Sequence, residues 1–465
     1  MTMPRPHGRR GAVQPRFDEL EMSEGTVRRL VMSLAGPSIV DNLLVTLVSM
    51  ADMIMVGRLG ADAIAAVGLS NQPMFFALAS FMALNVGSTA LVARLVGARD
   101  HDGANSAARQ SMVISAMLGA LIGVIGFTWA PQILAFMGAE PDAMGRGIPY
   151  LRIVMVGVPF NVVAMNLTSV MRGAGDTRTP MKIGLVSNFV NVFFNYALIY
   201  GHFGLPRLEV AGAAYATLLA RLVGCILVIG FLSTGRFVIA LHLKADYRPR
   251  RETMVRIMRV GLPAAVEQFV MRGGQLMFVR IVASLGTVVY AAHQVAINVE
   301  SLSFMPGWGF AAAATSLVGQ GLGAKRPDWA ERLARGAVKY AMVIAVLMGV
   351  VFFTLGYPIA SLYTNLPEVA TAAAMVLRLV AVVQPFALTN FTLGGALRGA
   401  GDTRYTLLAT VVGVWGIRLP LAYLLVVRGN MGLLGAWIGM TLDMFVRALL
   451  VYARFQTGRW KKIRV

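Results

Sequence analysis

The sequence predicts an all-α polytopic membrane protein with twelve transmembrane helices in two pseudo-symmetric six-helix lobes. Three observations lead to this fold class. The 465-residue chain has a mean hydropathy of +0.67 and only 14% charged residues, whereas soluble domains carry about 25%. Apolar runs long enough to cross about 30 Å of hydrocarbon follow one another along the chain. Residues 171–178 recur at 397–404 with a single difference, which indicates an internal duplication.

The duplication divides the predicted spans equally. The difference in residue number between its two copies (397 − 171), here called the repeat offset, fits six helices with their loops. It aligns Pro37 with Pro263 and Gly60 with Gly286. Two copies of an even number of spans have the same topology, so we expect parallel repeats related by an axis along the membrane normal. The spans are expected at residues 31–56, 67–93, 110–130, 148–170, 182–201, 211–233, 257–283, 292–318, 337–361, 372–395, 406–427 and 433–455.

The basic residues predict the orientation. Most of the 42 Lys and Arg lie in loops on one side of the spans, and the positive-inside rule places that side, with both termini, in the cytoplasm. The formal charge of +20 therefore reflects the basic residues that orient the protein in the membrane, and no nucleic-acid partner is expected. The polar first 29 residues predict no cleavable signal peptide. We expect a cytoplasmic arm at 1–30, an N-lobe at 31–235, a linker at 236–256, a C-lobe at 257–455 and a tail at 456–465.

Two carboxylates occupy equivalent places in the repeat. Glu267 follows Asp41 by the repeat offset, each acid follows a proline by four residues, and each precedes an amide, Asn42 or Gln268. An ionisable group at the bilayer centre costs roughly 2.5–3.5 kcal/mol on insertion scales, so it needs a function or a partner. We expect the two acids to bind protons or cations in a central cavity. The alternative for each is a structural ion pair.

Two asparagines are candidates for the same site. Asn191 and Asn195 are four residues apart, hence on one helix face. We expect them to donate hydrogen bonds to a protonatable Asp41 on a neighbouring helix. The alternative is that they join helices without a transport role.

Three further acids lie in predicted spans. Glu300 either lines the cavity or packs near His293. Asp52 is expected near the outer membrane interface. Asp443 precedes Arg447 by four residues, and a structural ion pair is the expectation there.

The repeated RGAGDTR sequence, at 172–178 and 398–404, falls in cytoplasmic loops. Its glycines permit a tight turn with positive φ, and the Asp or Thr after them can cap the next helix. We interpret the motif as a turn that joins two spans. The alternative is a direct contact that takes part in gating.

The sequence supports neither a catalytic site nor a metal site. We find no nucleophile–base pair, metal-ligand cluster or phosphate-binding loop, and the single cysteine, Cys225, lies in an apolar run. We therefore expect neither an enzyme nor a bound cofactor or metal, apart from H⁺ or Na⁺ as a coupling ion. The expected partners are small organic molecules and the lipid bilayer, and the expected state is a monomer.

Three motifs in order resemble the multidrug and toxic compound extrusion (MATE) family of secondary transporters. They are the paired RGAGDTR loops, the asparagine-containing residues 191–201, and residues 300–320 with their Pro-Gly-Trp-Gly-Phe core. The resemblance covers nearly the whole chain from about Leu30 to Phe455. It implies two six-helix lobes and export of organic cations driven by H⁺ or Na⁺.

The resemblance also implies roles for individual residues. Asp41 matches the first-helix coupling acid of the DinF branch, Asn191 and Asn195 match its fifth-helix partners, and Thr217 matches a sixth-helix threonine of the network. NorM-like members carry a tenth-helix acid eleven residues before the loop arginine, where this chain has Ala387. Glu267 resembles the seventh-helix acid. Coupling through the N-lobe, with a proton on Asp41, is therefore the favoured expectation.

The predicted function is a multidrug antiporter of the cytoplasmic membrane that exports amphipathic, mostly cationic compounds in exchange for H⁺, or alternatively Na⁺. The main alternative is a flippase for lipid-linked oligosaccharides or lipids of the same superfamily. It would use embedded basic residues to bind pyrophosphate, and Arg272, Arg280, Arg378 and Arg418 are candidates. A membrane enzyme or a channel would need a polar cluster or a continuous polar stripe, which the sequence lacks.

Overall fold

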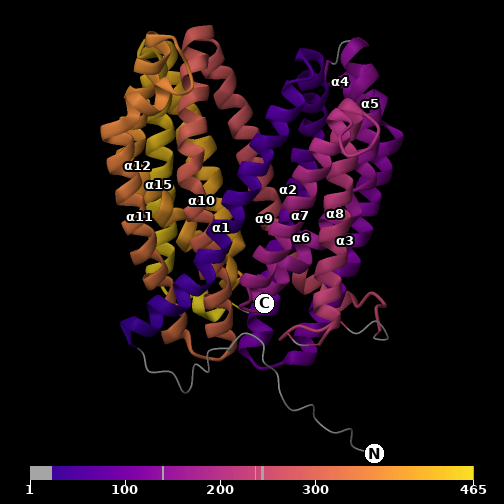
Figure 1. Ribbon diagram of the computed structural model, residues 1–465. Helices are drawn as coiled ribbons and strands as arrows, with labels where there is room; N and C mark the ends of the chain where they lie inside the picture. Colours follow the sequence, from indigo (N-terminus) through magenta and orange to yellow (C-terminus); the bar gives the residue numbers. More distant parts are fainter. Residues whose placement is uncertain (1–22, 139–140, 236, 242–245, 464) are drawn as a thin grey trace, which may run out of the picture. The chain divides into compact units, whose positions relative to one another are not determined.

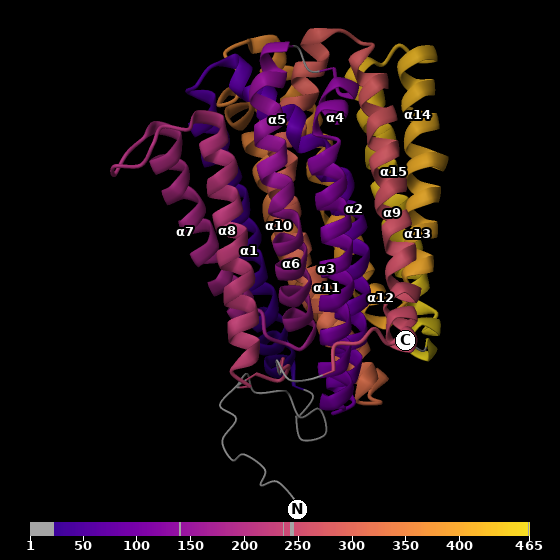
Figure 2. The same cartoon turned by 90° about the vertical axis from the view of Figure 1, so that its right-hand side faces the viewer.

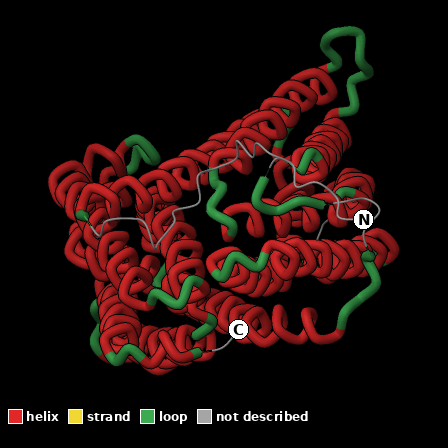
Figure 3. The backbone as a smooth tube through the Cα atoms, turned by 90° about the horizontal axis from the view of Figure 1, so that it is seen from below, coloured by secondary structure: helices red, strands yellow, loops and turns green. Residues whose placement is uncertain are grey.

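The computed structural model describes the chain except for residues 1–22, 139–140, 236, 242–245 and 464. Every regular element in this described part is helical (Figure 3). The elements are α1 (Glu24–Gly57), α2 (Ala61–Gly97), α3 (His101–Thr128), α4 (Ala130–Phe136), α5 (Pro141–Val156), α6 (Val158–Gly173), α7 (Arg178–Tyr200), α8 (Glu209–Ser233), α9 (Arg251–Ala283), α10 (Thr287–Gly323), α11 (Pro327–Ser361), α12 (Pro367–Ala400), α13 (Thr403–Thr410), η1 (Val411–Arg418), α14 (Leu419–Tyr423), η2 (Leu424–Arg428), α15 (Gly432–Gln456) and η3 (Arg459–Lys462).

These helices confirm the predicted succession of spans. Ten predicted spans each lie in one helix, apart from at most two end residues. The fourth span is α5 with α6, bent by 45° at Gly157. The eleventh runs from α13 to η2 through two π-helical stretches. Within the described residues, eight helices are long and apolar enough to cross a membrane, or nine with the bent pair. The helices α2, α9 and α10 match predicted spans without meeting that criterion.

The chain forms two compact units. Unit 1 comprises Val40–Gly261, and unit 2 comprises Leu262–Val465 together with residues 23–39. The first part of α1 therefore packs in unit 2, whereas the predicted N-lobe began at residue 31. The first part of α9 likewise packs in unit 1. Each of these helices changes unit within three residues of a proline, Pro37 or Pro263.

The exchanged helix ends pack against a glycine in each unit. A Cβ added to Gly87 of α2 would lie 2.2 Å from the Ile257 carbonyl oxygen on α9, within unit 1. A Cβ added to Gly309 of α10 would lie 2.3 Å from the Ile39 side chain on α1, within unit 2. Since real Cβ atoms essentially never approach so closely, these glycines allow the helix backbones to meet, as small residues do in membrane bundles.

Other helix pairs also pack through small residues. In unit 2, a Cβ on Gly349 of α11 would lie 2.8 Å from the Ala381 carbonyl oxygen on α12, and Figure 1 shows α10, α11 and α12 side by side. In unit 1, a Cβ on Gly212 of α8 would lie 2.6 Å from the Leu198 carbonyl oxygen on α7. Figure 2 shows these two helices as neighbours joined by one loop.

The repeated loops form the predicted tight turn. Gly175 and Gly401 have φ of 91° and 88°, in the left-handed region that glycine enters without strain. The amide after each glycine donates back to the preceding helix, at 2.9 Å for Asp176 and 2.8 Å for Asp402. Each turn therefore ends one span and fixes where the next begins.

Candidate functional site

An ion pair inside unit 1 joins α1 to the repeated loop. Asp41 lies on α1, four residues after Pro37, and is 8% exposed. Arg172 lies at the end of α6, and its Nη2 donates to Asp41 Oδ2 at 2.7 Å. Leaving a buried charge without a partner is strongly destabilising, so Arg172 supplies the counter-charge that Asp41 needs.

Unit 2 repeats the ion pair. Glu267 on α9 is 6% exposed and accepts a hydrogen bond from Arg398 Nη2 at 2.8 Å. Two hydroxyl groups also donate to it: Thr406 Oγ1 to Oε2 at 2.8 Å, and Thr410 Oγ1 to Oε1 at 3.4 Å. Both acids of the repeat thus have an internal arginine partner from an RGAGDTR loop.

The surroundings of the two ion pairs differ. The unit 1 positions equivalent to Thr406 and Thr410 are Pro180 and Gly184, which carry no side-chain donor. A Cβ on Gly184 would lie 2.5 Å from Asp41 Oδ1, so the missing side chain lets the carboxylate lie against α7. Among the described residues, one side chain donates a hydrogen bond to the Asp41 carboxylate and three donate to the Glu267 carboxylate.

A second carboxylate on α1 lies beside the two asparagines. Asn195 Nδ2 donates to Asp52 Oδ1 at 2.5 Å and to Asn191 Oδ1 at 3.2 Å. The predicted contact of these asparagines with Asp41 is therefore wrong. Asp52 follows Asp41 by eleven residues, about three helical turns, so both acids face α7 but are about 16 Å apart along α1. The asparagines meet the second acid.

This asparagine cluster, defined as Asp52, Asn191 and Asn195, has a surplus of oxygen acceptors. Asn195 is 1% exposed, and its Oδ1 is buried without a hydrogen-bond partner. With its nitrogen turned toward Asp52, the Asn191 amide donates to Oδ1 at 2.9 Å and to Oδ2 at 3.2 Å. With its oxygen turned that way, it faces the carboxylate as another acceptor. In that second arrangement, only a proton or a small cation between the oxygens would relieve their repulsion.

The other predicted site residues lie outside these clusters. Asn42 and Gln268 are partly exposed, and the described residues show no hydrogen bond from either side chain. Thr217 on α8 is partly exposed and makes no hydrogen bond to the asparagine cluster in the part of the chain that is described. Ala387 is 3% exposed in the apolar core of unit 2.

A buried ion network in unit 2 contains Arg418, which acts electrostatically on Glu300. Asp443 is fully buried and accepts from Arg418 Nη2 at 2.6 Å and from Arg447 Nε at 2.7 Å, which confirms the predicted pairing of Asp443 with Arg447. Glu300 is 1% exposed, and Arg418 is the charged group that acts on it. This burial favours the packing alternative for Glu300.

The sequence contained a signal for the arginine partners. Arg172 and Arg398 are separated by the repeat offset, as are Asp41 and Glu267. Two opposite charges repeated at one offset indicate a repeated ion pair. The interpretation of the motif as a turn was correct for its glycines but missed the role of its arginines.

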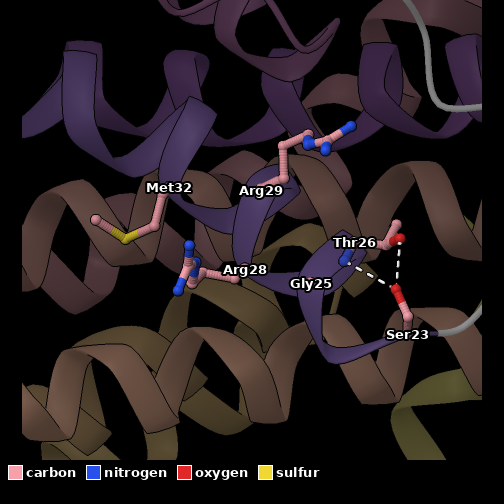
Figure 4. A pocket seen from close by; sticks show the side chains of 6 residues that line it. All are labelled: Ser23, Gly25, Thr26, Arg28, Arg29 and Met32. Carbon is pink, nitrogen blue, oxygen red and sulfur yellow. Dashed lines mark hydrogen bonds between the residues drawn. The ribbon is translucent and has the colours of Figure 1, made fainter.

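The described residues contain no group of three or more His, Cys, Asp or Glu placed to hold a metal ion. A pocket at the start of α1, where Ser23 Oγ accepts from the Thr26 amide at 3.2 Å (Figure 4), contains none of the predicted site residues. It is lined by Ser23, Gly25, Thr26, Arg28, Arg29 and Met32.

Two repeats of membrane-spanning helices, with carboxylates buried inside both, define a class of protein: a polytopic membrane transporter built by duplication. A family model described as MatE matches residues 37–197 and 263–424. The two matches begin at Pro37 and Pro263, which are separated by the repeat offset. The chain belongs to the MatE family, whose members transport small molecules across membranes, and this confirms the predicted family.

Individual proteins show the same relationship. The chain is 34% identical over 438 residues to "Probable multidrug resistance protein NorM" of Thermotoga maritima, covering 94% of each chain. It is 30% identical to "Multidrug resistance protein PmpM" of Pseudomonas aeruginosa, covering 93% of this chain and 92% of that one. A solved structure described as the outward-facing conformation of a multidrug resistance MATE family transporter of the MOP superfamily superposes with a TM-score of 0.86 at 26% identity, covering 95% and 99% of the two chains.

Proposed function

We propose that this protein is a secondary active antiporter that exports small organic compounds, mostly cationic and amphipathic, in exchange for protons. The observation that carries the proposal is the asparagine cluster, a membrane carboxylate with amide partners and an unpartnered acceptor. The multidrug resistance names of the Thermotoga and Pseudomonas relatives support organic substrates. The distribution of Lys and Arg supports a cytoplasmic membrane protein with both termini in the cytoplasm.

Asp52 is the proposed coupling acid. When ionised, it accepts hydrogen bonds from the amides of Asn191 and Asn195. When protonated, it donates one hydrogen bond, and an amide oxygen must turn to accept it. Uptake of one proton thus reorients the amides and changes how α1 is held against α7. Such a local change is what a transporter needs to alternate between two states.

Asp41 has a different part in the proposed network. Its proton would compete with Arg172, which lies 2.7 Å away, and neutralising one partner of a buried pair leaves the other charge uncompensated. None of the described Lys or Arg side chains pairs with Asp52. We therefore move the coupling proton from Asp41, the acid favoured on sequence grounds, to Asp52, and assign Asp41 to holding α1 in place.

The energies are sufficient for export. One positive charge moving inward gains about 2.3 kcal/mol per 100 mV, while a tenfold substrate gradient costs about 1.4 kcal/mol. A single proton therefore sustains a gradient of tens-fold for a neutral substrate at about 100 mV. Exchange of one proton for one monovalent cation is electroneutral, so the pH difference alone drives it.

The deciding experiment uses purified protein in proteoliposomes with a fluorescent organic cation. Asp52→Asn should abolish accumulation driven by an imposed pH gradient, because the proton site is lost while the shape of the side chain is kept. Glu267→Gln is the control in unit 2 and should retain coupled transport. The same assay with a Na⁺ gradient and no pH gradient decides the ion. Uphill transport by Asp52→Asn, driven by either ion, refutes the proposal.

A flippase for lipid pyrophosphates remains the second candidate. Arg272, Arg280 and Arg378 are exposed, which suits an anionic substrate, although Arg418 is held by Asp443. One similar structure, with a TM-score of 0.86 at 26% identity, is described as having a binding pocket of reverse polarity that suggests a different function of that protein. Thermal stabilisation by a lipid pyrophosphate, without stabilisation by organic cations, would favour this second function.

A further inference from the structure

The inference concerns Arg172 and rests on the proposed function of the asparagine cluster. In unit 1, α1 and α7 run parallel and meet in a constant register. Asp41 lies against Gly184, and Asp52 accepts from Asn195, so both contacts join positions that differ by 143 (184 − 41 and 195 − 52). A shift of α1 along α7 at the first contact therefore displaces the second contact by the same amount.

The arginine that holds the first contact is itself rigidly placed. A Cβ on Gly173 would lie 2.8 Å from the Thr89 carbonyl oxygen, so the end of α6 meets α2 directly. Thr89 Oγ1 also donates to the Ser169 carbonyl oxygen at 3.1 Å. The backbone that carries Arg172 is thus fixed on α2, and its guanidinium extends from this anchor to Asp41.

Unit 2 provides the comparison. The same anchor recurs, with Thr315 Oγ1 donating to the Gly395 carbonyl oxygen at 2.8 Å and a Cβ on Gly399 meeting Thr315. Glu267, however, is held by two hydroxyl groups in addition to its arginine. The position equivalent to Asp52 is Phe278, which is 2% exposed in an apolar core. Unit 2 thus has a more strongly held helix and no carboxylate for that helix to position.

We propose that Arg172 is a positioning residue for ion coupling. By holding Asp41, it sets the register of α1 on α7 that brings Asp52 to Asn191 and Asn195. Because Pro180 and Gly184 contribute no donor, a single ion pair holds the Asp41 carboxylate in unit 1. Beyond Asp52, the Tyr200 hydroxyl on α7 also holds α1, by donating to the Met55 carbonyl oxygen at 3.0 Å. In unit 2 three side chains hold the equivalent carboxylate of Glu267, and the corresponding arginine is dispensable for coupling.

Cysteine cross-linking measures the register directly. Val45 and Asn188 differ in position by the same amount as the two contacts (188 − 45) and lie between them, so Val45→Cys with Asn188→Cys, in a Cys225→Ala background, should cross-link. Arg172→Gln should lower the yield about threefold to tenfold, the range expected for loss of one polar contact between membrane helices. The equivalent pair in unit 2 is Met271→Cys with Val414→Cys. Its yield should change less than about twofold on Arg398→Gln, because the hydroxyls of Thr406 and Thr410 remain.

Coupling is measured on the same arginine variants without the added cysteines. Arg172→Gln should shift the pH of half-maximal efflux by about one unit, a tenfold change in proton affinity. Arg398→Gln should leave that pH unchanged. Arg172→Lys, which retains the charge, should restore part of both the cross-link and the pH profile. This variant keeps the test decisive if Arg172→Gln does not fold.

The inference is overturned if Arg172→Gln cross-links as well as its parent, because the ion pair then does not set the register. It is also overturned if the cross-link is lost while the pH profile of Arg172→Gln is unchanged, because the register then does not serve coupling. The proposed function is decided separately by Asp52→Asn. Coupled transport by that variant refutes Asp52 as the coupling acid, whatever the cross-linking shows.

Discussion

Gly184→Ala should break the Asp41–Arg172 ion pair without removing either partner. The added Cβ would lie 2.5 Å from Asp41 Oδ1, whereas ordinary contacts begin at 3.4 Å. The carboxylate must therefore move by about 0.9 Å (3.4 − 2.5), and if it moves away from Arg172, the 2.7 Å hydrogen bond exceeds 3.5 Å. Overpacking of this kind costs about 1–3 kcal/mol.

The matched control is Gly230→Ala on α8. A Cβ at Gly230 meets no atom within 4 Å, so alanine should be neutral or should stabilise the helix by about 0.5–1 kcal/mol. The chain contains one cysteine, Cys225, which is 6% exposed. A thiol-reactive fluorogenic dye therefore reports unfolding of the detergent-purified protein through this residue. Gly184→Ala should lower the midpoint of thermal unfolding relative to the parent, and Gly230→Ala should not.

A double-mutant cycle tests the cause. In an Asp41→Ala background the carboxylate that clashes is absent, so Gly184→Ala should cost little or nothing there. Mutations of residues in contact are non-additive by about 0.5–3 kcal/mol. Equal destabilisation by Gly184→Ala in both backgrounds, or a Gly184→Ala protein as stable as Gly230→Ala, would show that the carboxylate does not lie against α7 as described.

Three further predictions concern other parts of the chain. Asp443→Asn should destabilise unit 2 by about 3–5 kcal/mol, because it removes the charge of the carboxylate that pairs with both Arg418 and Arg447; a normal thermal midpoint would contradict this. Trp460→Ala should lower the same midpoint, because the indole is fully buried and stacks on Phe455 with the ring centroids 5.0 Å apart. Loss of such a side chain costs about 3–5 kcal/mol. Gln110→Ala should speed tryptic cleavage of the linker, because this side chain hydrogen-bonds to the linker backbone twice, each at 2.8 Å; an unchanged cleavage rate would count against that role.

The spans and the repeat follow from sequence because they depend on local composition. Hydropathy predicts a helix of the right length wherever about twenty apolar residues occur, and the left-handed turns at Gly175 and Gly401 follow from a motif that only glycine suits. The equivalence of Asp41 and Glu267 follows from the repeat offset alone. The spans and the turns are thus determined within a few residues of where they are observed, and the equivalence of the two acids by comparison of the two repeats.

The partner of each acid depends on helix register, which composition does not encode. Asp41 and Asp52 lie on the same face of α1, so periodicity alone assigns either of them to Asn191 and Asn195. Only the packing of α1 on α7 selects the second acid. The arginine that pairs with Asp41 is far from it in the sequence, at position 172, and it reaches the carboxylate because Gly173 lets α6 approach α2 closely.

The packing of the first part of α1 in unit 2 has a consequence for how the protein arose. Each unit is completed by a helix end that belongs to the other half of the sequence, as in a domain-swapped dimer. An ancestor with a single repeat would have had no surface of its own on which its first helix segment could pack. It could complete its helix bundle only by pairing with a second copy of itself. Fusion of two copies would make this exchange intramolecular, which removes the concentration dependence of assembly. The present halves, expressed as separate polypeptides, should therefore be stable together rather than alone.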